Sequence, residues 1–371
     1  MRAHAGMQRR RLLQAAAACG LAPLPWIARA QSQRTPIADM HSHYGLITRR
    51  PLATSGLADE LRNQRVALMA WKLVADGPWL RESPTGIEVY RTPQAGQLAA
   101  TFDTRIAGMK AYLREQRLKT VLTTDDVDAC IAANGEPGVV LASEGAHFLE
   151  GRVDNLKAAY DTGLRHLQFV HFVPSPVGDN QTLAPVHHGL SAMGKQLVEA
   201  CNAQHMLIDL AHASMEVVEQ AVQITKAPLI WSHGWVGRVA GRWLDTVTYK
   251  QRRMSLAHAK KIADIGGVVG LWGLALNKPG PAWAAGSDSW TVGLHDTEGY
   301  ARELANLIDK LGSDHVAIGT DVEGVGKNWS VNDYAGVRDV LEHLRQMKLP
   351  SATIERVAYG NYARVLKAVL R

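Results

Sequence analysis

The sequence predicts a single-domain, closed (β/α)8 barrel of the TIM type that follows a short leader. Three observations indicate this fold. Apolar, β-rich runs alternate with amphipathic stretches, which is typical of a parallel sheet covered by helices. Eight such runs can be counted, and eight strand–helix units can close a barrel. The chain has 371 residues, 46% of them hydrophobic, which suffices for one large barrel or for two smaller domains.

The eight expected strands are separated by stretches long enough to hold helices. They cover residues 37–43, 66–73, 138–144, 166–171, 207–212, 228–233, 267–272 and 315–321. Residues 193–203 and 297–311 are among the expected helices, because both stretches are amphipathic. A doubly wound open sheet is the main structural alternative, although no G-x-G-x-x-G motif follows the first strand. The stretches 76–104 and 277–292 are expected to be insertions that shape a substrate pocket on one barrel face.

Residues 1–30 have the features of a twin-arginine signal peptide. Arg9-Arg10-Arg11 precedes an apolar stretch over 12–27, and Ala28-Arg29-Ala30 is a small-x-small cleavage site. The barrel domain, 31–371, is therefore expected in the periplasm or outside the cell. It has no other segment apolar enough to span a bilayer. In an oxidising compartment Cys130 and Cys201 could form one disulfide.

The basic net charge of the chain belongs to this leader. The sequence has 41 Lys and Arg against 35 Asp and Glu, a formal charge of +6. Residues 1–30 contain five arginines and no acid, so the remaining balance is 36 basic to 35 acidic residues. A nearly neutral mature protein gives no support to a nucleic-acid partner.

Residues that can bind metals or transfer protons stand at the ends of six of the eight expected strands. They are His41, His43, Glu144, His171, His212, His233 and Asp321. The carboxyl ends of barrel strands converge on one face, where the active sites of such barrels lie. A lone histidine at a strand end is more often structural, but unrelated core histidines have no reason to collect at these positions.

The residue types at these positions suit a hydrolytic metal centre. His41 and His43 are two apart on one strand, so their side chains face the same way and can reach one metal. Imidazole and carboxylate donors without a thiolate suit zinc, and also manganese, iron or cobalt. Glu144 could bridge two ions, and Asp321 could accept a proton from water. Such a site can hydrolyse an amide, an ester or a phosphoester.

Several motifs, in this order, resemble those of the membrane (renal) dipeptidase family of zinc metallopeptidases. They are DMHSH (39–43), TTDDV (123–127), SEGAH (143–147), LIDLAHAS (207–214), WSH (231–233), AIGTDVEGV (317–325) and GNYARV (360–365). The matching text runs through most of the mature chain. The resemblance implies an amidohydrolase-like (β/α)8 barrel and a metal-dependent dipeptidase.

The resemblance also implies a role for each site residue. His41 and His43 would hold a first zinc ion, His212 and His233 a second, and Glu144 would bridge the two. His171 would bind the substrate and stabilise the oxyanion, and Asp321 would orient the bridging hydroxide and shuttle its proton. Arg242 would bind the C-terminal carboxylate of the substrate. The spacing of that arginine is loose, and Arg238 or Arg252 could serve instead.

The sequence departs from the family pattern at His43, where the family has an aspartate. A neutral ligand makes the site one unit more positive, which either lowers the pKa of bound water further or weakens the first metal. Two zinc ions are expected and one is possible.

The leading hypothesis is a dipeptidase that takes a dipeptide-like small molecule, and a homodimer is compatible with it. The alternative is a metal-dependent amidohydrolase or lactonase, or a phosphoesterase, acting on a non-peptide substrate. A non-catalytic binding protein is disfavoured because ligand binding alone does not require a proton acceptor such as Asp321.

Overall fold

The computed structural model describes residues 34–46, 56–83, 86–237, 251–274, 296–324 and 329–371. Within this range, Pro36–Arg371 forms one compact unit. The predicted signal peptide and the predicted insertion 277–292 lie outside the described residues. Among the helices of the described part, none combines the length and apolarity that crossing a membrane requires.

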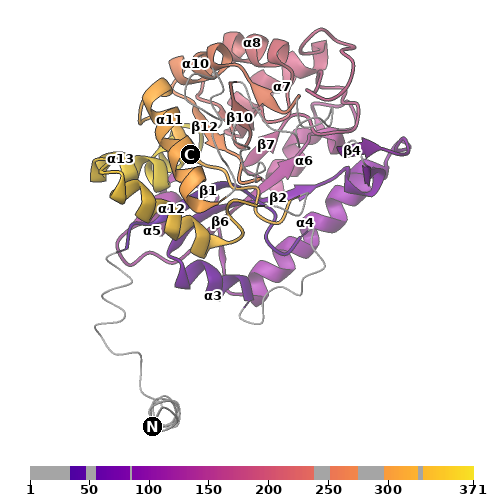
Figure 1. Cartoon of the computed structure of the whole chain (residues 1–371). Helices are drawn as coiled ribbons and strands as arrows, with labels where there is room; N and C mark the ends of the chain where they lie inside the picture. Colours follow the sequence, from indigo (N-terminus) through magenta and orange to yellow (C-terminus); the bar gives the residue numbers. More distant parts are fainter. Residues whose placement is uncertain (1–33, 47–55, 84–85, 238–250, 275–295, 325–328) are drawn as a thin grey trace, which may run out of the picture. The chain divides into compact units, whose positions relative to one another are not determined.

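Eight parallel strands form a closed barrel, which confirms the predicted fold (Figure 1). Going round the barrel, they are β1 (Ile37–Ser42), β2 (Val66–Val74), β6 (Gly138–Glu144), β7 (His166–Gln168), β8 (Leu207–Asp209), β9 (Ile230–Trp231), β12 (Val268–Leu271) and β13 (Val316–Ile318). The pairing of β2 with β6 closes the ring, and β13 returns to β1 with Asp39 opposite Ile318. A short strand, β5 (Lys119–Thr120), adds to the edge of β6.

Helices surround the strands (Figure 1). They are α3 (Gly56–Asn63), α4 (Gln97–Glu115), α5 (Thr124–Ile131), α6 (Asn155–Asp161), α7 (Ala192–Ala203), α8 (Met215–Ile224), α10 (Leu256–Asp264), α11 (Thr297–Leu311), α12 (Tyr334–Gln346), α13 (Ser351–Glu355) and α14 (Asn361–Val369). Several begin at a side chain that accepts a backbone N–H in the first turn, which fixes the start of the helix. These caps include Thr123, Ser191, Ser214, Ser255, Asp296 and Asp333.

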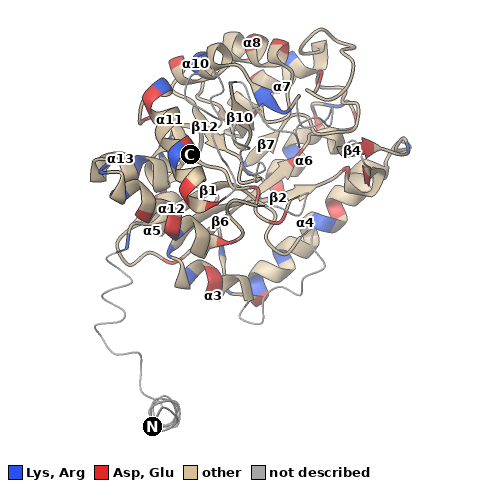
Figure 2. Cartoon of the chain, in the orientation of Figure 1, with Lys and Arg blue, Asp and Glu red and all other residues tan. Residues whose placement is uncertain are grey.

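Lysine, arginine and acidic residues are interspersed along the outer helices in the view of Figure 2. This mixture agrees with the nearly neutral balance of the sequence beyond its leader. Inside the barrel, apolar residues such as Leu68 and Ala70 of β2 recur at every second position, and Lys72 continues the same face.

Most strands are shorter at their carboxyl ends than predicted, whereas β6 ends at Glu144 as predicted and β2 extends one residue further, to Val74. The predicted ends His171, His212 and Asp321 each lie three residues beyond the observed strands. His212 has φ 68° and Asp321 has φ 56°, in the left-handed region that a β-strand cannot contain. These residues therefore stand in the first turn after each strand, at the mouth of the barrel, rather than in the sheet.

The predicted insertion 76–104 is partly regular. It contains a 3-10 turn (Gly77–Trp79), an antiparallel hairpin of β3 (Leu80–Ser83) and β4 (Gly86–Val89), and the first turns of α4. The disulfide considered for Cys130 and Cys201 is absent, because both are free thiols buried in the separate helices α5 and α7.

Candidate metal centre at the mouth of the barrel

Four histidines from three strands meet as two pairs. His41, in β1, and His43, one residue beyond it, bring their Nε2 atoms within 3.1 Å of each other. His212, after β8, and His233, after β9, have Nε2 atoms 3.2 Å apart. All four side chains are buried, and they project toward one point from the carboxyl ends of their strands. The structure thus brings together residues that are up to 192 positions apart in the sequence.

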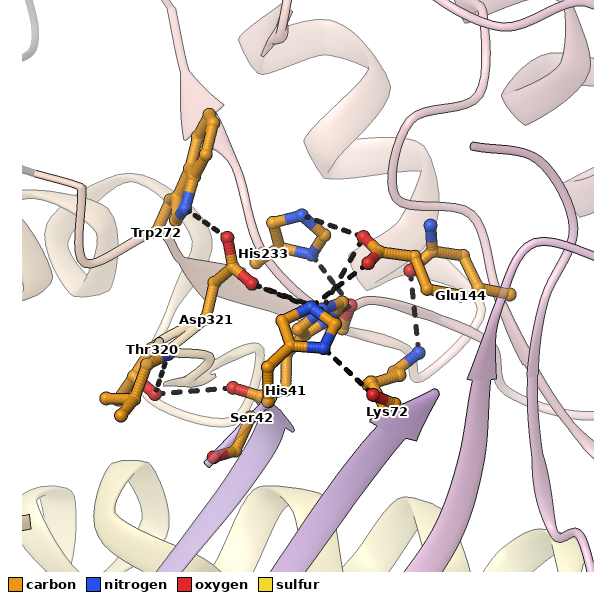
Figure 3. Close-up of polar contacts among 12 residues, drawn as sticks. His41, Ser42, Lys72, Glu144, His233, Trp272, Thr320 and Asp321 are labelled. Carbon is orange, nitrogen blue, oxygen red and sulfur yellow. Dashed lines mark hydrogen bonds and ion pairs between the residues drawn. The ribbon is translucent and has the colours of Figure 1, made fainter. Parts of the chain in front are cut away.

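Glu144, the last residue of β6, contacts both pairs, and Figure 3 shows its carboxylate directed toward His41 and His233. Its Oε2 is 3.0 Å from His43 Nε2, and its Oε1 is 3.1 Å from His212 Nε2. His41 and His233 are slightly farther from Oε1, at 3.5 and 3.6 Å. One carboxylate therefore faces both histidine pairs, which is the arrangement that a bridging ligand requires.

The donor set fits divalent metal ions. Two nitrogen ligands of one tetrahedral zinc ion lie about 3.3 Å apart, given Zn–N bonds of about 2.05 Å. The 3.1 and 3.2 Å separations in the two pairs are close to this value. Nitrogen and oxygen donors without a thiolate suit zinc, manganese, iron or cobalt.

The electrostatics of the site also favour a cation. Burial opposes protonation of His43, but the carboxylates of Asp321 and Glu144 outweigh it and raise the pKa of this imidazole to about 10. Burial lowers the pKa of His41, and of His212 and His233 more strongly, so these three rings are neutral and can offer a lone pair.

Hydrogen bonds to Nδ1 turn Nε2 of the ligands toward the centre. His43 Nδ1 donates to the backbone oxygen of Lys72 at 2.8 Å, since a carbonyl can only accept. The hydroxyl of Ser232 lies 2.9 Å from His41 Nδ1 and 3.2 Å from His233 Nδ1. One serine therefore orients one histidine of each pair.

His171 lies beside the histidine pairs and is held by a buried carboxylate. Its Nδ1 is 2.7 Å from Asp76 Oδ1, while Asp76 Oδ2 accepts the backbone N–H groups of Phe172 and Val173. Burial opposes protonation, but the charge of Asp76 outweighs it and raises the pKa of His171. Its Nε2 is 3.5 Å from Glu144 and can act as a donor or, with Glu144 and His212, as part of a metal site.

Asp321 approaches the His41–His43 pair from the opposite side. Its Oδ1 is 3.1 Å from His43 Nε2 and 3.4 Å from His41 Nε2. Its Oδ2 accepts the indole N–H of Trp272 at 2.8 Å (Figure 3). The carboxylate rests directly on Gly324, where a Cβ atom would come within 2.6 Å of both oxygens. Only glycine leaves room for this position of Asp321.

A cavity of about 310 Å³ opens over these groups. Its wall includes Leu80, Arg81, Glu82 and Ile87 of the β3–β4 hairpin, together with Val74, Arg105, Phe172, Arg252 and Trp272. The predicted carboxylate-binding residue Arg242 and the alternative Arg238 lie outside the described residues. The other alternative, Arg252, is in the cavity: its Nη2 is 3.1 Å from His233 Nε2, and Nη1 also contacts His212.

A buried ion pair supports the centre from within the barrel. Lys72 Nζ, on β2, crosses the interior to Asp209 Oδ2 on β8 at 2.6 Å and lies 3.0 Å from His166 Nε2. Burial opposes ionisation of Asp209, but the charge of Lys72 outweighs it and holds the pKa of this carboxyl well below its usual range. Asp209 Oδ1 in turn accepts the backbone N–H of Ser232 at 3.0 Å, which fixes the serine between its two histidines.

Sequence reasoning missed Asp76, Ser232 and Trp272 as parts of the site. Asp76 follows β2 by two residues and Trp272 follows β12 by one. These are the two strands for which no site residue was predicted, so position at a strand end was a sufficient signal for both. All eight strands therefore contribute to the mouth. Ser232 lies in a quoted motif, but its contact with His41 depends on the tertiary structure.

Known proteins resemble this chain in sequence. The model of a family described as Membrane dipeptidase (Peptidase family M19) matches residues 89–371. The chain is 28% identical over 213 residues to an uncharacterized dipeptidase of Schizosaccharomyces pombe, covering 56% of this chain and 47% of that protein. It is 24% identical over 266 residues to Dipeptidase tcpJ of Claviceps purpurea, covering 69% and 56%. The chain thus spans about half the length of these curated relatives.

Solved structures share the fold at low sequence identity. The dipeptidase AC, a metallo peptidase, matches with a TM-score of 0.71 and 21% identity over 91% of this chain and 99% of that chain. A metallo peptidase from Rhodobacter sphaeroides, liganded with a phosphinate mimic of the dipeptide L-Ala-D-Ala, matches with a TM-score of 0.68 and 20% identity over 90% and 99%. Since the family model covers most of the sequence, including Glu144, His171, His212, His233 and Asp321, the chain belongs to the membrane dipeptidase family.

Proposed function

We propose that this protein is a metal-dependent dipeptidase that hydrolyses the amide bond of dipeptides or similar short amides. One observation carries the proposal: Glu144 lies between two histidine pairs, with Asp321 beside them, under a cavity that Arg252 lines. Family membership adds support, since the family is described by this activity.

In this proposal His41 and His43 would hold one ion, His212 and His233 would hold another, and Glu144 would be shared by the two positions. Bound ions would lower the pKa of a water molecule and polarise the substrate carbonyl. Two zinc ions are the proposed complement: the two histidine pairs account for the number, and their nitrogen donors are among those that suit zinc. Metal analysis of the purified protein tests this number, and a ratio near one per chain would implicate the neutral ligand His43.

The remaining residues act on protons and on the substrate. Asp321 accepts the proton of the attacking water and passes it to the amine that leaves when the C–N bond breaks. His171, whose pKa is raised, donates from Nε2 to the developing oxyanion. Arg252 is the described arginine in contact with the histidine pair, and we assign it the substrate carboxylate. Arg242, which the family resemblance implies for the same role, is the second candidate and lies outside the described residues.

The decisive test compares metal-depleted and metal-reloaded protein on a panel of dipeptides, lactones and phosphoesters. We expect release of amino acids only from dipeptides and only after reloading. Asp321→Asn should retain its ions and lose about 10²- to 10⁴-fold in kcat, since the amide cannot accept a proton. Full activity without metal would refute the proposal, and activity on lactones alone would favour the alternative hydrolase.

Export is a separate part of the proposal. Residues 1–30 are proposed to direct the folded protein to the periplasm or the medium by the twin-arginine route. Replacing Arg10 and Arg11 by lysine should leave the full-length chain in the cytoplasmic fraction on an immunoblot. An unchanged distribution would contradict this route. A homodimer is also proposed, and sedimentation of the mature chain tests it.

A further inference from the structure

Trp272 contacts three different groups of the centre at once. It lies one residue beyond the end of β12, a strand for which no site residue was predicted. Its side chain is buried. Its indole nitrogen bonds Asp321, its ring lies under Arg252, and the edge of His233 meets it at 5.6 Å. Trp272 is not one of the proposed metal ligands, so metal binding alone does not account for these contacts.

The indole N–H fixes the orientation of the Asp321 carboxylate. An indole nitrogen can only donate, so the 2.8 Å contact engages Asp321 Oδ2 as an acceptor. Oδ1, which is also buried, makes no well-aligned hydrogen bond among the described residues, although it lies 3.1 Å from His43 Nε2. The bond thus turns one oxygen away from the centre and leaves the other facing it (Figure 3).

The face of the same ring holds the proposed substrate arginine. Arg252 Cζ lies 4.8 Å from the centre of the Trp272 ring, within the range of a cation–π contact. Trp235 also packs against this ring, at 4.7 Å between ring centres. The indole plane therefore sets where the guanidinium sits, independently of its N–H group.

We propose that Trp272 is a positioning residue with two separable functions: its N–H orients Asp321 for proton transfer, and its ring face places Arg252 for the substrate carboxylate. This inference rests on the proposed function. It predicts that the two parts of one side chain affect different kinetic constants, since Asp321 acts in the chemical step and Arg252 in binding.

The test uses two substitutions in the metal-loaded mature protein. Trp272→Phe keeps an aromatic face and removes the N–H, so we expect kcat to fall about 10- to 100-fold with little change in KM. Trp272→Leu removes both, so KM should rise as well. The Trp272→Leu variant should also no longer prefer a dipeptide with a free C-terminal carboxylate over the same dipeptide with a C-terminal amide. The Trp272→Phe variant should retain this preference.

Trp231→Phe is the matched control. Trp231 is equally buried, and its indole nitrogen has no hydrogen-bond partner among the described residues. The same change there should leave kcat and KM close to wild type. Metal content and melting temperature, measured for every variant, separate a positioning effect from a loss of ions or of the fold.

A double mutant addresses the pathway of the effect. If Trp272 acts through Asp321, adding Trp272→Phe to Asp321→Asn should lower kcat no further. If the kcat losses of the two single variants multiply in the double mutant, or if Trp272→Phe alone leaves kcat unchanged, the proposal is overturned. The assay uses whichever substrate of the panel the wild type hydrolyses. If the wild type hydrolyses no dipeptide, the proposed function is overturned. If the Trp272→Phe variant is unaffected, only the role of Trp272 is overturned.

Discussion

Replacing Ser232 by alanine should weaken both metal positions together. The hydroxyl lies 2.9 Å from His41 Nδ1 and 3.2 Å from His233 Nδ1, and each of these histidines belongs to a different pair. Loss of a hydrogen-bond partner of a metal-bound histidine typically costs 10- to 100-fold in metal affinity, which corresponds to about 1.4–2.8 kcal/mol. We expect this loss at each position, because the alanine leaves both Nδ1–H groups without their acceptor.

Competition titration against a chelator of known zinc affinity measures the two dissociation constants. Ser143→Ala is the matched control, since Ser143 is also fully buried at the barrel mouth. Its hydroxyl has no hydrogen-bond partner among the described residues. This variant should bind metal like the wild type, and melting temperatures of the metal-free proteins report any loss of the fold.

The two dissociation constants show whether Ser232 orients both histidines. Weakening of one ion only would show that the serine serves a single histidine. Equal affinities in Ser232→Ala and Ser143→Ala would show that the hydroxyl does not orient either ligand.

Three further changes have defined expected results. His43→Asp adds an anionic ligand, so calorimetry should show the weaker ion binding about tenfold more tightly (about 1.4 kcal/mol); weaker binding would mean that the bond to Lys72 O matters more. Lys72→Met leaves the buried Asp209 without its cationic partner and should cost about 3–5 kcal/mol in urea unfolding. Adding Asp209→Asn should then cost less than a second independent loss, and strict additivity would exclude the ion pair. The pair should be at full strength at pH 7, because a carboxyl with a depressed pKa contributes its stability above the unfolded pKa of about 3.9 and loses it only as pH falls through the lower folded value. Gly324→Ala would place a Cβ atom 2.6 Å from the Asp321 oxygens, so kcat should fall about 10²-fold with metal content unchanged; unaltered kcat would show that the loop yields.

The fold could be predicted because each barrel strand is a short apolar run between amphipathic helices. All eight strands lie within their predicted ranges or extend them by one residue, as at Val74. Apart from β2 and β6, the carboxyl ends were predicted too late, since the pattern of apolar residues continues into the turns. Nothing in residue type alone distinguishes His212 as a left-handed turn residue from a strand residue.

The candidate site was predictable to the extent that strand ends converge. His41 and His233 come together because their strands end on the same face, although 192 positions separate them. The hydrogen bonds that orient these residues depend on distances between side chains, which a sequence does not contain. The substrate arginine was left open between three positions for the same reason, and of these Arg252 lines the cavity.

The β3–β4 hairpin contributes Leu80, Arg81, Glu82 and Ile87 to the cavity, yet none of its described residues belongs to a candidate metal-ligand group. In the proposed function, contacts with the substrate side chains and the chemical step would therefore fall partly to different segments, the hairpin after the second strand and the rim of the barrel. Natural variation in the hairpin can therefore change which substrate side chains the cavity accepts, without a change in the proposed metal ligands. Exchange of this segment between relatives offers a route to new selectivity on an unchanged hydrolytic core.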